Sequence, residues 1–468
     1  MTTKGMAMEL KGKKVLVVGL GRSGMSAARF LRGHGAKVTV SDSRSAAALA
    51  KDVPELLEAG IMVEAGGHGL LTFRRQDLIV ISPGVPLDTP EVKQVMALGM
   101  PVIGELELAS QFLVGKIVAI TGSNGKTTTA TLVGKIFEDA GWATQVGGNI
   151  GLPVVELIAG DSVETWDVLE VSSFQLETID AFRPRIAAVL NLTPDHLDRH
   201  GTFANYAAAK ARITENQTAE DFLVLNAEDK ETQMVAAKTR ARIFWFSGRR
   251  PIKQGAFVHG ESVVWMPSEG GRAEPVMPVA EISLKGEHNV ENVLAAVTMG
   301  RLAGVTSESI RKTVAAFKAV EHRLELVATI QGVEFYNDSK ATNVDATRKA
   351  LASFPGSVHL ILGGRDKDSD YSLLSDLVRE RVNFVYTIGS AAEKIERQLA
   401  GVAKIESAGT LDVAVARAKK RAVPGDVVLL APACSSFDQF ENYEHRGRVF
   451  RELVLGSGLS PQGSEDKS

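Results

Sequence analysis

The stretch KIVAITGSNGKTTTATLVGKIFEDAG, residues 116–141, joins an apolar run, a glycine-rich loop and a helical pattern. The apolar run KIVAI predicts a buried strand, and the loop TGSNGKTTT opens the helix that follows. Backbone N–H groups of such a loop can hold phosphate oxygens at the positive end of a helix. The stretch therefore predicts a phosphate-binding loop within a parallel α/β sheet.

Two side chains in this loop suit a nucleoside triphosphate. Lys126 is expected to neutralise the β- and γ-phosphates, and the Thr127 hydroxyl to bind Mg²⁺. The loop is a shortened one, because Ile120 stands where the pattern G-x-x-x-x-G-K-[ST] has its first glycine. A glycine-rich turn without nucleotide is the alternative. The expected phosphate contacts are Gly122, Ser123, Asn124, Gly125, Lys126, Thr127 and Thr128.

Two further polar residues follow later apolar runs. Glu170 ends a buried-looking run, where a charge is costly unless it meets a cation, so we expect it to reach Mg²⁺. A carboxylate that caps the next helix is the alternative. His196 is expected just inside a helix begun by Thr193 and Pro194, at the same sheet edge. It is a candidate metal ligand, with a purely structural histidine as the alternative.

An earlier stretch, KKVLVVGLGRSGMSAARF (13–30), has the spacing G-x-G-x-x-G at Gly19, Gly21 and Gly24. This is the dinucleotide-binding fingerprint, with glycines that allow a pyrophosphate to approach a helix N-terminus. Asp42, at the end of the next apolar run, could bind a ribose hydroxyl. Taken alone, the pattern favours an NAD-dependent oxidoreductase.

Short β-branched runs alternate with helical patterns along the whole chain, which predicts an α/β fold of three domains with parallel sheets. Between about Ala241 and Lys285, the runs RIFWFSG, GAFVHG and SVVWMP predict short antiparallel strands appended to the second domain. The expected segments are a Rossmann-like domain over 1–114, a central P-loop ATPase-like domain over 115–320, a Rossmann-like domain over 321–456 and a disordered tail over 457–468.

The third domain has three polar loops after apolar runs: NDSKATN (337–343), GGRDKD (363–368) and PACSSFDQF (432–440). They are either polar turns with helix caps or a binding site for a charged small molecule. Ligands of open parallel sheets bind at the carboxyl ends of the strands. Because three such loops share one sheet edge, the binding site is the favoured interpretation.

Composition excludes several classes of protein. The 468 residues carry 53 Lys and Arg against 56 Asp and Glu, so no overall positive field attracts nucleic acid or anionic membrane. Cys434 is the single cysteine, which excludes a disulfide framework and fits a reducing cytosol. No apolar run approaches the roughly 20 residues that span a bilayer, and the N-terminus lacks a signal-peptide core. A cytoplasmic location is expected.

Together these motifs resemble the Mur ligases, the ATP-dependent amide-forming enzymes of peptidoglycan precursor synthesis. TGSNGKTT is similar to the shortened P-loop of that family, and NDSKATN with PACSSFDQF is similar to its D-glutamate-adding member. The resemblance implies an enzyme that uses ATP and Mg²⁺ to join D-glutamate to UDP-N-acetylmuramoyl-L-alanine. We expect a monomer, because one chain can complete the cleft, and the composition predicts no nucleic-acid partner and no membrane span. The implied route runs through an acyl phosphate and a tetrahedral intermediate. The first domain would then hold uridine diphosphate rather than NAD.

The resemblance also implies roles that no local pattern assigns. Lys210, by periodicity a helix-face lysine, matches the lysine that these enzymes carbamylate with CO₂ to make an anionic metal ligand. The implied catalytic residues are Lys126, Glu170, His196 and Lys210, and the implied metal ligands are Thr127, Glu170, His196 and Lys210. The remaining implied contacts are Asn289, Asn292, Arg323, Asp338 and Lys340 for ATP; Gly21, Arg22, Ser23, Ser43, Arg44, Ser82, Gly84 and Asn149 for the UDP-sugar; and Thr342, Lys367, Ser436 and Tyr443 for D-glutamate.

Three alternatives stay open at this point. A folylpolyglutamate synthase shares the shortened loop and also adds glutamate. Such an enzyme should lack a UDP-type domain before the loop, whereas about 115 residues precede the loop here. An NAD-dependent oxidoreductase is the second alternative. A regulatory nucleotide-binding protein without catalysis is the third, and the polar loops of the last domain argue against it.

Overall fold

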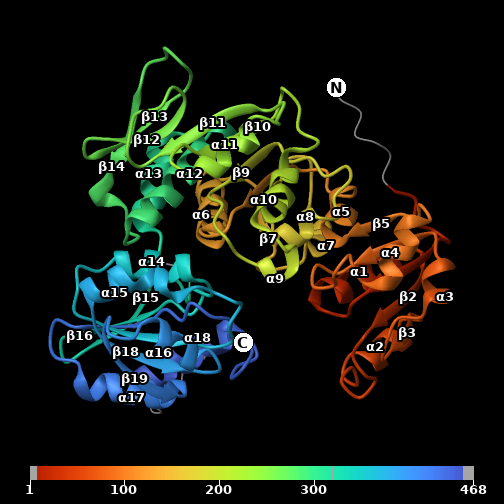
Figure 1. The fold of residues 1–468 in the computed structure, drawn as a ribbon. Coiled ribbons are helices and arrows are strands. Elements are labelled where there is room, and N and C mark those ends of the chain that lie inside the picture. Colours follow the sequence, from red (N-terminus) through yellow and green to blue (C-terminus); the bar gives the residue numbers. More distant parts are fainter. Residues whose placement is uncertain (1–7, 319–320, 457–468) are drawn as a thin grey trace, which may run out of the picture. The chain divides into compact units, whose positions relative to one another are not determined.

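The computed structural model describes residues 8–318 and 321–456 (Figure 1). The expected tail over 457–468 lies outside the described residues. The described chain forms sheets of five, nine and six strands. It divides into two compact units: the first unit holds the first two sheets, and the second unit holds the third sheet with the short segments Asp195–Asp198 and Ile282–Val290.

The first sheet is parallel throughout, with the strand order β3-β2-β1-β4-β5. After the exposed Lys14, the central strands β1 and β4 are apolar and buried at every position, because helices cover both faces of a parallel sheet. The strands are β1 (Lys14–Val18), β2 (Lys37–Asp42), β3 (Met62–Ala65), β4 (Leu78–Ile81) and β5 (Val102–Gly104), and the helices are α1 (Arg22–Gly33), α2 (Val53–Glu58), α3 (Leu70–Arg74), α4 (Pro90–Ala97) and α5 (Glu105–Ser110).

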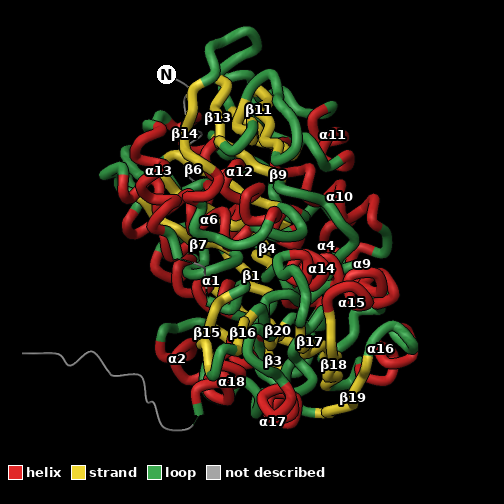
Figure 2. The backbone as a smooth tube through the Cα atoms, turned by 90° about the vertical axis from the view of Figure 1, so that its left-hand side faces the viewer, coloured by secondary structure: helices red, strands yellow, loops and turns green. Residues whose placement is uncertain are grey.

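The central sheet has the order β14-β13-β12-β11-β10-β9-β6-β8-β7, and its antiparallel strands lie together at one end (Figures 1 and 2). Its strands are β6 (Lys116–Thr121), β7 (Thr144–Gly148), β8 (Trp166–Glu170), β9 (Ile186–Val189), β10 (Phe222–Asn226), β11 (Arg242–Ser247), β12 (Gly255–His259), β13 (Ser262–Met266) and β14 (Glu274–Pro278). Its helices are α6 (Lys126–Asp139), α7 (Val154–Leu157), α8 (Ser173–Leu176), α9 (Leu197–His200), α10 (Phe203–Ala211), α11 (Lys230–Ala236), α12 (Glu287–Ala303) and α13 (Ser307–Ala316).

The expected antiparallel addition is present in β12, β13 and β14, but the expectation for the run RIFWFSG is wrong. Strand β11 pairs in parallel with both β10 and β12. The reason is its connection: helix α11 carries the chain from the end of β10 back to the start of β11, which is the crossover that a parallel pair requires. A short run of apolar residues does not itself reveal the direction of its neighbour.

The third sheet has the order β15-β16-β20-β17-β18-β19 and is parallel except for β15. A tight turn at Gln331 and Gly332, both with positive φ, joins β15 to β16 as a hairpin. Hydrophobic clusters pack on both faces of this sheet. The strands are β15 (Glu325–Ile330), β16 (Val333–Asn337), β17 (Val358–Gly363), β18 (Val382–Ile388), β19 (Lys404–Gly409) and β20 (Val427–Leu430), and the helices are α14 (Val344–Ala352), α15 (Ser375–Arg381), α16 (Ala392–Gln398), α17 (Leu411–Arg421) and α18 (Tyr443–Leu455).

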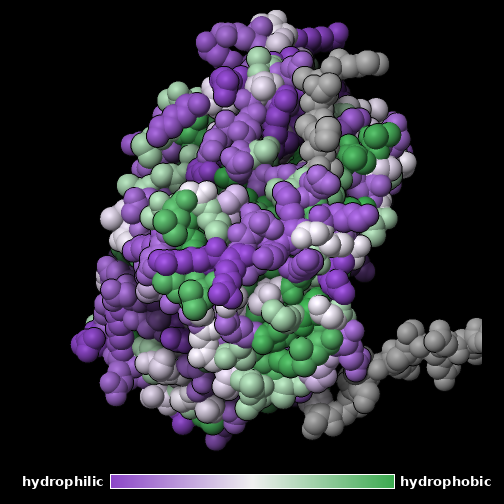
Figure 3. Space-filling model, turned by 90° about the vertical axis from the view of Figure 1, so that its right-hand side faces the viewer, coloured by the Kyte–Doolittle hydropathy of each residue, from purple (hydrophilic) through white to green (hydrophobic). Residues whose placement is uncertain are grey.

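The surface is mixed in character. On the face drawn in Figure 3, hydrophobic residues form separate groups among hydrophilic ones. Across the described ranges, no helix combines the length and the apolar character needed to cross a bilayer.

The expected α/β fold with mainly parallel sheets is confirmed.

Helix α5 joins the first two sheets through buried glutamates. Leu106 and Leu108 of its ELEL sequence enter the shared hydrophobic core. The fully buried Glu107 carboxylate accepts hydrogen bonds from the backbone N–H groups of residues 180, 181 and 182, at 2.8 to 3.1 Å. These donors belong to the chain after α8, so one carboxylate ties the first sheet's last helix to the central layer.

Replacement of this carboxylate tests that connection. Glu107→Gln should lower the free energy of unfolding by about 2 kcal/mol, because an amide loses the charge and one acceptor that the backbone donors require. Urea unfolding followed by tryptophan fluorescence reports on the first unit, which contains all four tryptophans. The matched control is Glu58→Gln, at an exposed position of α2. Equal unfolding curves for the two variants would contradict the role of Glu107.

Candidate active site

The loop over residues 122–125 follows β6, and two glycines permit its conformation. Gly122 has a φ of 147° and Gly125 a φ of 88°, which side-chain-bearing residues rarely adopt. A Cβ on Gly122 would lie 3.1 Å from the Cβ of Leu190, and one on Gly125 would collide with Asn292. Helix α6 begins at Lys126, directly after the loop. The loop therefore has the close packing and the helix N-terminus that a phosphate-binding turn requires.

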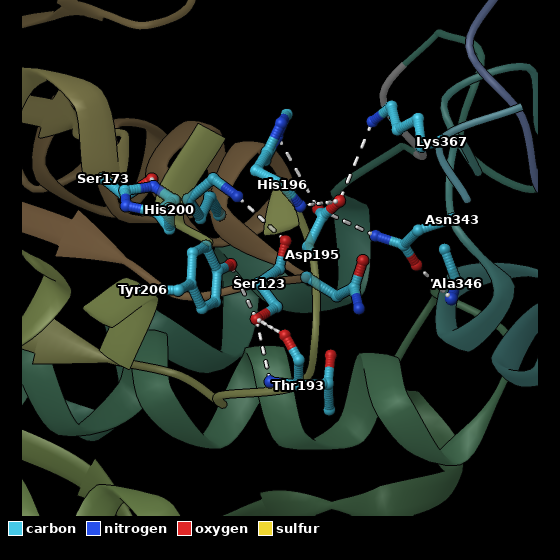
Figure 4. A network of polar contacts seen from close by, with 12 residues as sticks. Ser123, Ser173, Thr193, Asp195, His196, His200, Tyr206, Asn343, Ala346 and Lys367 are labelled. Atoms are coloured by element: carbon cyan, nitrogen blue, oxygen red, sulfur yellow. Dashed lines mark hydrogen bonds and ion pairs between the residues drawn. The ribbon is translucent and has the colours of Figure 1, made fainter. Parts of the chain in front are cut away.

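Hydrogen bonds hold this loop against the chain that follows β9. The N–H of Asn124 donates to Asn191 Oδ1 at 2.8 Å, and Asn191 Nδ2 donates to the Asn124 carbonyl at 3.0 Å. The Ser123 hydroxyl donates to the Thr193 carbonyl at 2.9 Å and lies 2.8 Å from the Tyr206 hydroxyl (Figure 4). The loop is thus held in place by side chains before any ligand binds.

Two lysine ammonium groups lie at the loop. Lys126 Nζ donates to the carbonyl oxygens of two loop residues, at 2.8 and 2.9 Å. Lys210, on α10, donates to the Gly122 carbonyl at 2.9 Å and lies 3.3 Å from the Thr121 hydroxyl. Its side chain is 2% exposed, and Nζ lies 4.9 Å from the centre of the Tyr206 ring. The fold therefore brings Lys210 to the loop, although its sequence pattern indicated only a helix face.

Glu170 ends β8 beside the loop. It is 1% exposed; Oε2 accepts from the Thr127 hydroxyl at 2.7 Å, and Oε1 accepts from Asn149 Nδ2 at 2.8 Å. Ser172, and not Glu170, caps the next helix. The hydroxyl and the carboxylate are hard oxygen donors of the kind that Mg²⁺ prefers. In the described parts of the chain there is no group of three or more His, Cys, Asp or Glu residues that could hold a metal ion.

A cavity of about 510 Å³ opens at the carboxyl ends of β1, β2 and β4. Residues that follow β7 in the central sheet complete its wall. All eight residues expected at the UDP-sugar site line it: Gly21, Arg22, Ser23, Ser43, Arg44, Ser82, Gly84 and Asn149. His68 and Gln175 also line the cavity, and the sequence analysis missed both because neither belongs to a recognisable motif.

The glycine-rich turn after β1 is closely packed against the turn after β4. The Ser82 hydroxyl donates to the Gly19 carbonyl at 2.7 Å. A Cβ on Gly24 would collide with that carbonyl, which explains the third glycine of the fingerprint. Helix α1 begins at Arg22, so its first N–H groups lie at the cavity.

Asp42 is engaged within the protein. Its carboxylate accepts from Arg44 Nε and Nη2 at 3.0 and 2.9 Å and from the Leu20 N–H at 2.7 Å. Burial alone would raise the pKa of Asp42, but the hydrogen bonds from Arg44 and Leu20 outweigh it and lower the pKa to about 2. The acid that suggested a ribose contact is thus used to orient Arg44, which also donates to the Leu20 carbonyl at 3.0 Å.

In the second unit, the three polar loops do share one sheet edge. Strands β16 and β17 both pair in parallel with β20, so their carboxyl ends lie side by side. The expected ligand residues follow these strands or flank them: Arg323 precedes β15; Asp338, Lys340 and Thr342 follow β16; Lys367 follows β17; Ser436 follows β20; and Tyr443 begins α18.

Buried charges organise this edge. Burial raises the pKa of Asp338 to about 7, against the lowering effects of the Arg323 charge and the Leu324 N–H. Lys340 Nζ lies 3.8 Å from the centre of the Tyr443 ring, within cation–π distance. Arg446 is fully buried and donates to the hydroxyl and carbonyl oxygens of residue 339 at 2.9 and 2.8 Å and to the carbonyl of residue 434 at 3.2 Å. It joins two of the loops, and no sequence signal identified it.

The segment Asp195–Asp198 also belongs to the second unit. Asp195 Oδ2 accepts from Asn343 Nδ2 at 3.1 Å, and Oδ1 lies 3.7 Å from Lys367 Nζ (Figure 4). His196 is not inside a helix as expected: it has a φ of 53° and precedes α9. Its N–H donates to Asp195 Oδ1 at 3.0 Å, and because its positive φ is not helical, α9 begins only at Leu197.

The predicted ATP contacts on α12 fall in different units. Asn292 packs against Gly125 in the first unit. Asn289 belongs to the second unit, where Nδ2 donates to the Lys285 carbonyl at 2.7 Å. Of the expected catalytic and metal-binding residues, the first unit contains Lys126, Thr127, Glu170 and Lys210, which lie at or beside the loop over 122–125.

Family models match three successive parts of the chain. Residues 13–104 match the N-terminal domain of MurD-like Mur ligases, residues 120–300 match the Mur ligase middle domain, and residues 322–434 match the glutamate ligase domain of Mur ligases. The order and spacing of these matches agree with the three sheets of the structure.

Similar proteins carry one name. A UDP-N-acetylmuramoylalanine–D-glutamate ligase of Acidobacterium capsulatum is 65% identical over 448 residues, which are 96% of this chain and 97% of that protein. Ligases of the same name from Koribacter versatilis and Solibacter usitatus are 59% and 48% identical, over 96% and 97% of this chain and 98% and 100% of those proteins.

Solved structures agree on the fold. A pseudomurein peptide ligase type C from Methanothermus fervidus superimposes with a TM-score of 0.60 at 20% identity, over 95% of this chain and 99% of that chain. The MurF ligase of Thermotoga maritima, solved in complex with ADP, gives a TM-score of 0.58 at 17% identity, over 97% and 99%. The chain belongs to the Mur ligase family and, within it, to the UDP-N-acetylmuramoylalanine–D-glutamate ligases.

Proposed function

We propose that this chain is an ATP-dependent ligase that forms the amide bond between UDP-N-acetylmuramoyl-L-alanine and D-glutamate and releases ADP and phosphate. The observation that carries the proposal is the 65% identity, over 96% of the chain, to a ligase named for that reaction. The geometry supports it, because a shortened phosphate-binding loop meets a buried carboxylate, Glu170, and two lysines in one unit.

The cavity of the first sheet suits the UDP part of the first substrate. A diphosphate needs N–H donors and positive charge, and the cavity offers the start of α1 together with Arg22 and Arg44. Asn149 lines the cavity and also donates to Glu170, so the sugar site and the phosphate loop adjoin through one side chain. The sugar nucleotide would thereby direct its alanyl carboxylate toward the loop.

The chemistry requires activation, because a carboxylate is inert to amines. The alanyl carboxylate attacks the γ-phosphorus of ATP and displaces ADP, which gives an acyl phosphate. The D-glutamate amine then attacks that carbonyl, and the tetrahedral intermediate expels phosphate as the amine nitrogen loses a proton. Two anions must approach each other in the first step, so Lys126 neutralises phosphate charge at the loop. Mg²⁺ held by Thr127 and Glu170 would offset further negative charge there. We assign the remaining ATP contacts to Asn289, Asn292, Arg323, Asp338 and Lys340.

Lys210 and His196 complete the proposed metal set. A carbamate on Lys210 Nζ would convert a cation beside the Gly122 carbonyl into an anionic oxygen ligand. His196 would supply an imidazole nitrogen to a second Mg²⁺. Both roles follow from the family resemblance, and the burial of Lys210 at the loop supports the first of them.

The polar edge of the third sheet is the proposed D-glutamate site. Lys367 would pair with the side-chain carboxylate, and Ser436 would bind it through its hydroxyl and backbone. Thr342 and Tyr443 complete the proposed contacts. The loops that carry these residues adjoin at the ends of β16, β17 and β20.

Two further properties belong to this proposal. We place the domain boundaries at 114/115 and 320/321, and we expect a cytoplasmic monomer. The match to a MurD-like N-terminal domain favours a UDP-sugar over the folate alternative. The engagement of Asp42 by Arg44 weakens one of the two features that favoured NAD.

Phosphate release by the purified protein tests the reaction directly. With ATP, Mg²⁺ and UDP-N-acetylmuramoyl-L-alanine, release should depend on D-glutamate and stay near background with L-glutamate or without an amino acid. Activity on a folate with L-glutamate, and none in the first mixture, would establish the alternative ligase instead.

Lys126→Ala should reduce turnover by at least about a thousandfold, because a phosphate-neutralising cation at the transition state is lost. Binding of the UDP-sugar, measured by isothermal titration calorimetry, should stay within about twofold of the parent value, since Lys126 does not line the cavity. The matched control Lys135→Ala, at the exposed end of α6, should keep full turnover. A large loss of UDP-sugar affinity in Lys126→Ala would contradict the separation of the two sites.

Lys210→Ala should lose activity that added short carboxylates partly restore, because these would replace the carbamate oxygens. The carbamate itself should appear as a ¹³C resonance when the parent protein is incubated with ¹³C-bicarbonate, and it should be absent from the variant. Full activity of the untreated variant would remove the carbamate from the mechanism.

A further inference from the structure

A buried polar chain lies directly behind the proposed D-glutamate loops. The Tyr371 hydroxyl donates to Asp366 Oδ1 at 2.8 Å and lies 2.9 Å from Cys434 Sγ. Lys394 Nζ pairs with Asp366 Oδ2 at 2.7 Å. Tyr371 and Cys434 are fully buried. None of these four residues belongs to the ligand set assigned above.

These buried polar side chains connect the loop of Lys367 with the loop of Ser436. Asp366 directly precedes Lys367, and Cys434 lies two residues before Ser436. The backbones of these loops also pair, since the Arg365 N–H donates to the Ser435 carbonyl at 2.9 Å and the Ser435 N–H donates back at 3.2 Å. The Tyr371 hydroxyl therefore joins the side chains next to both proposed ligand residues.

The direction of each hydrogen bond follows from the titration states. Burial raises the pKa of the Cys434 thiol to about 12, so the thiol keeps its proton and donates to the Tyr371 oxygen. Tyr371 then donates its single proton to Asp366. Burial alone would raise the pKa of Asp366, but hydrogen bonds from Lys394 and Tyr371 outweigh it and lower the pKa. Asp366 is thus a fixed anion in a chain with one orientation.

We propose that Tyr371 and Asp366 are positioning residues for D-glutamate: they hold the loop of Lys367 against the loop of Ser436 so that both groups are in place before the amino acid binds. The inference rests on the proposed function, because it takes Lys367 and Ser436 as D-glutamate contacts. Preorganisation of this kind improves binding by removing the cost of ordering the loops. It acts on one substrate only, since neither residue lines the UDP-sugar cavity or the loop over 122–125.

Tyr371→Phe tests the proposal, because it removes one hydroxyl and keeps the buried ring. The KM for D-glutamate should rise about tenfold, as for the loss of one hydrogen bond to a charged group. The KM values for ATP and the UDP-sugar, and kcat at saturating D-glutamate, should stay within about twofold of the parent values. The matched control is Tyr386→Phe: Tyr386 is also fully buried in the third sheet, but its hydroxyl contacts His359 at 3.2 Å and neither loop.

Asp366→Asn provides a second test that keeps side-chain volume, and it should raise the same KM. If Tyr371→Phe lowers the melting temperature more than Tyr386→Phe does, the KM for D-glutamate of Asp366→Asn decides whether the positioning role holds. An unchanged KM for D-glutamate in both Tyr371→Phe and Asp366→Asn would overturn the positioning role. An equal loss of kcat, whichever substrate is varied, would overturn it as well. Failure of the proposed function would appear separately, as absence of D-glutamate-dependent phosphate release by the parent protein.

Discussion

The packing of one short loop constrains much of the first unit. Gly122 and Gly125 permit a turn that side-chain-bearing residues rarely adopt, and a Cβ would crowd Leu190 at the first position and collide with Asn292 at the second. Because this turn ends β6 in the interior of the nine-stranded sheet, its neighbours are the ends of β8 and β9. Glu170 reaches Thr127 from one side, and Asn191 reaches the loop backbone from the other. The candidate phosphate site is therefore built from segments far apart in sequence.

The same architectural rule accounts for all three sites. Parallel strands end at a common edge, where helix N-termini supply N–H donors and where side chains are not needed for the sheet itself. The first sheet uses this edge for a cavity with Arg22 and Arg44, the central sheet for Lys126 and Glu170, and the third sheet for three polar loops. Each of the three sheets therefore has one edge with polar groups suited to a charged ligand.

Buried charge is costly, and several buried charges of this protein lie at these edges. Glu170 and Lys210 are almost fully buried, yet each has hydrogen-bond partners within the loop region. Arg446 is satisfied by hydroxyl and carbonyl oxygens of two loops. Tyr371 extends the pattern, since a buried hydroxyl connects an anion to a thiol behind the proposed D-glutamate groups. Satisfied buried networks of this kind rigidify the segments that they connect.

The sequence by itself determined the strand–loop–helix units, the shortened phosphate loop and the order of the three α/β domains. These depend on local patterns: apolar runs, glycine spacing and helix starts lie within a few tens of residues. The family resemblance also pointed to eight residues that line one cavity. Three features depended on the tertiary structure. Lys210 donates a hydrogen bond to a carbonyl 88 residues away, Arg44 donates one to the Asp42 carboxylate, and β11 runs parallel to β10. Contacts of this kind arise from how the layers pack, and no local pattern encodes which distant backbone group a buried side chain will meet.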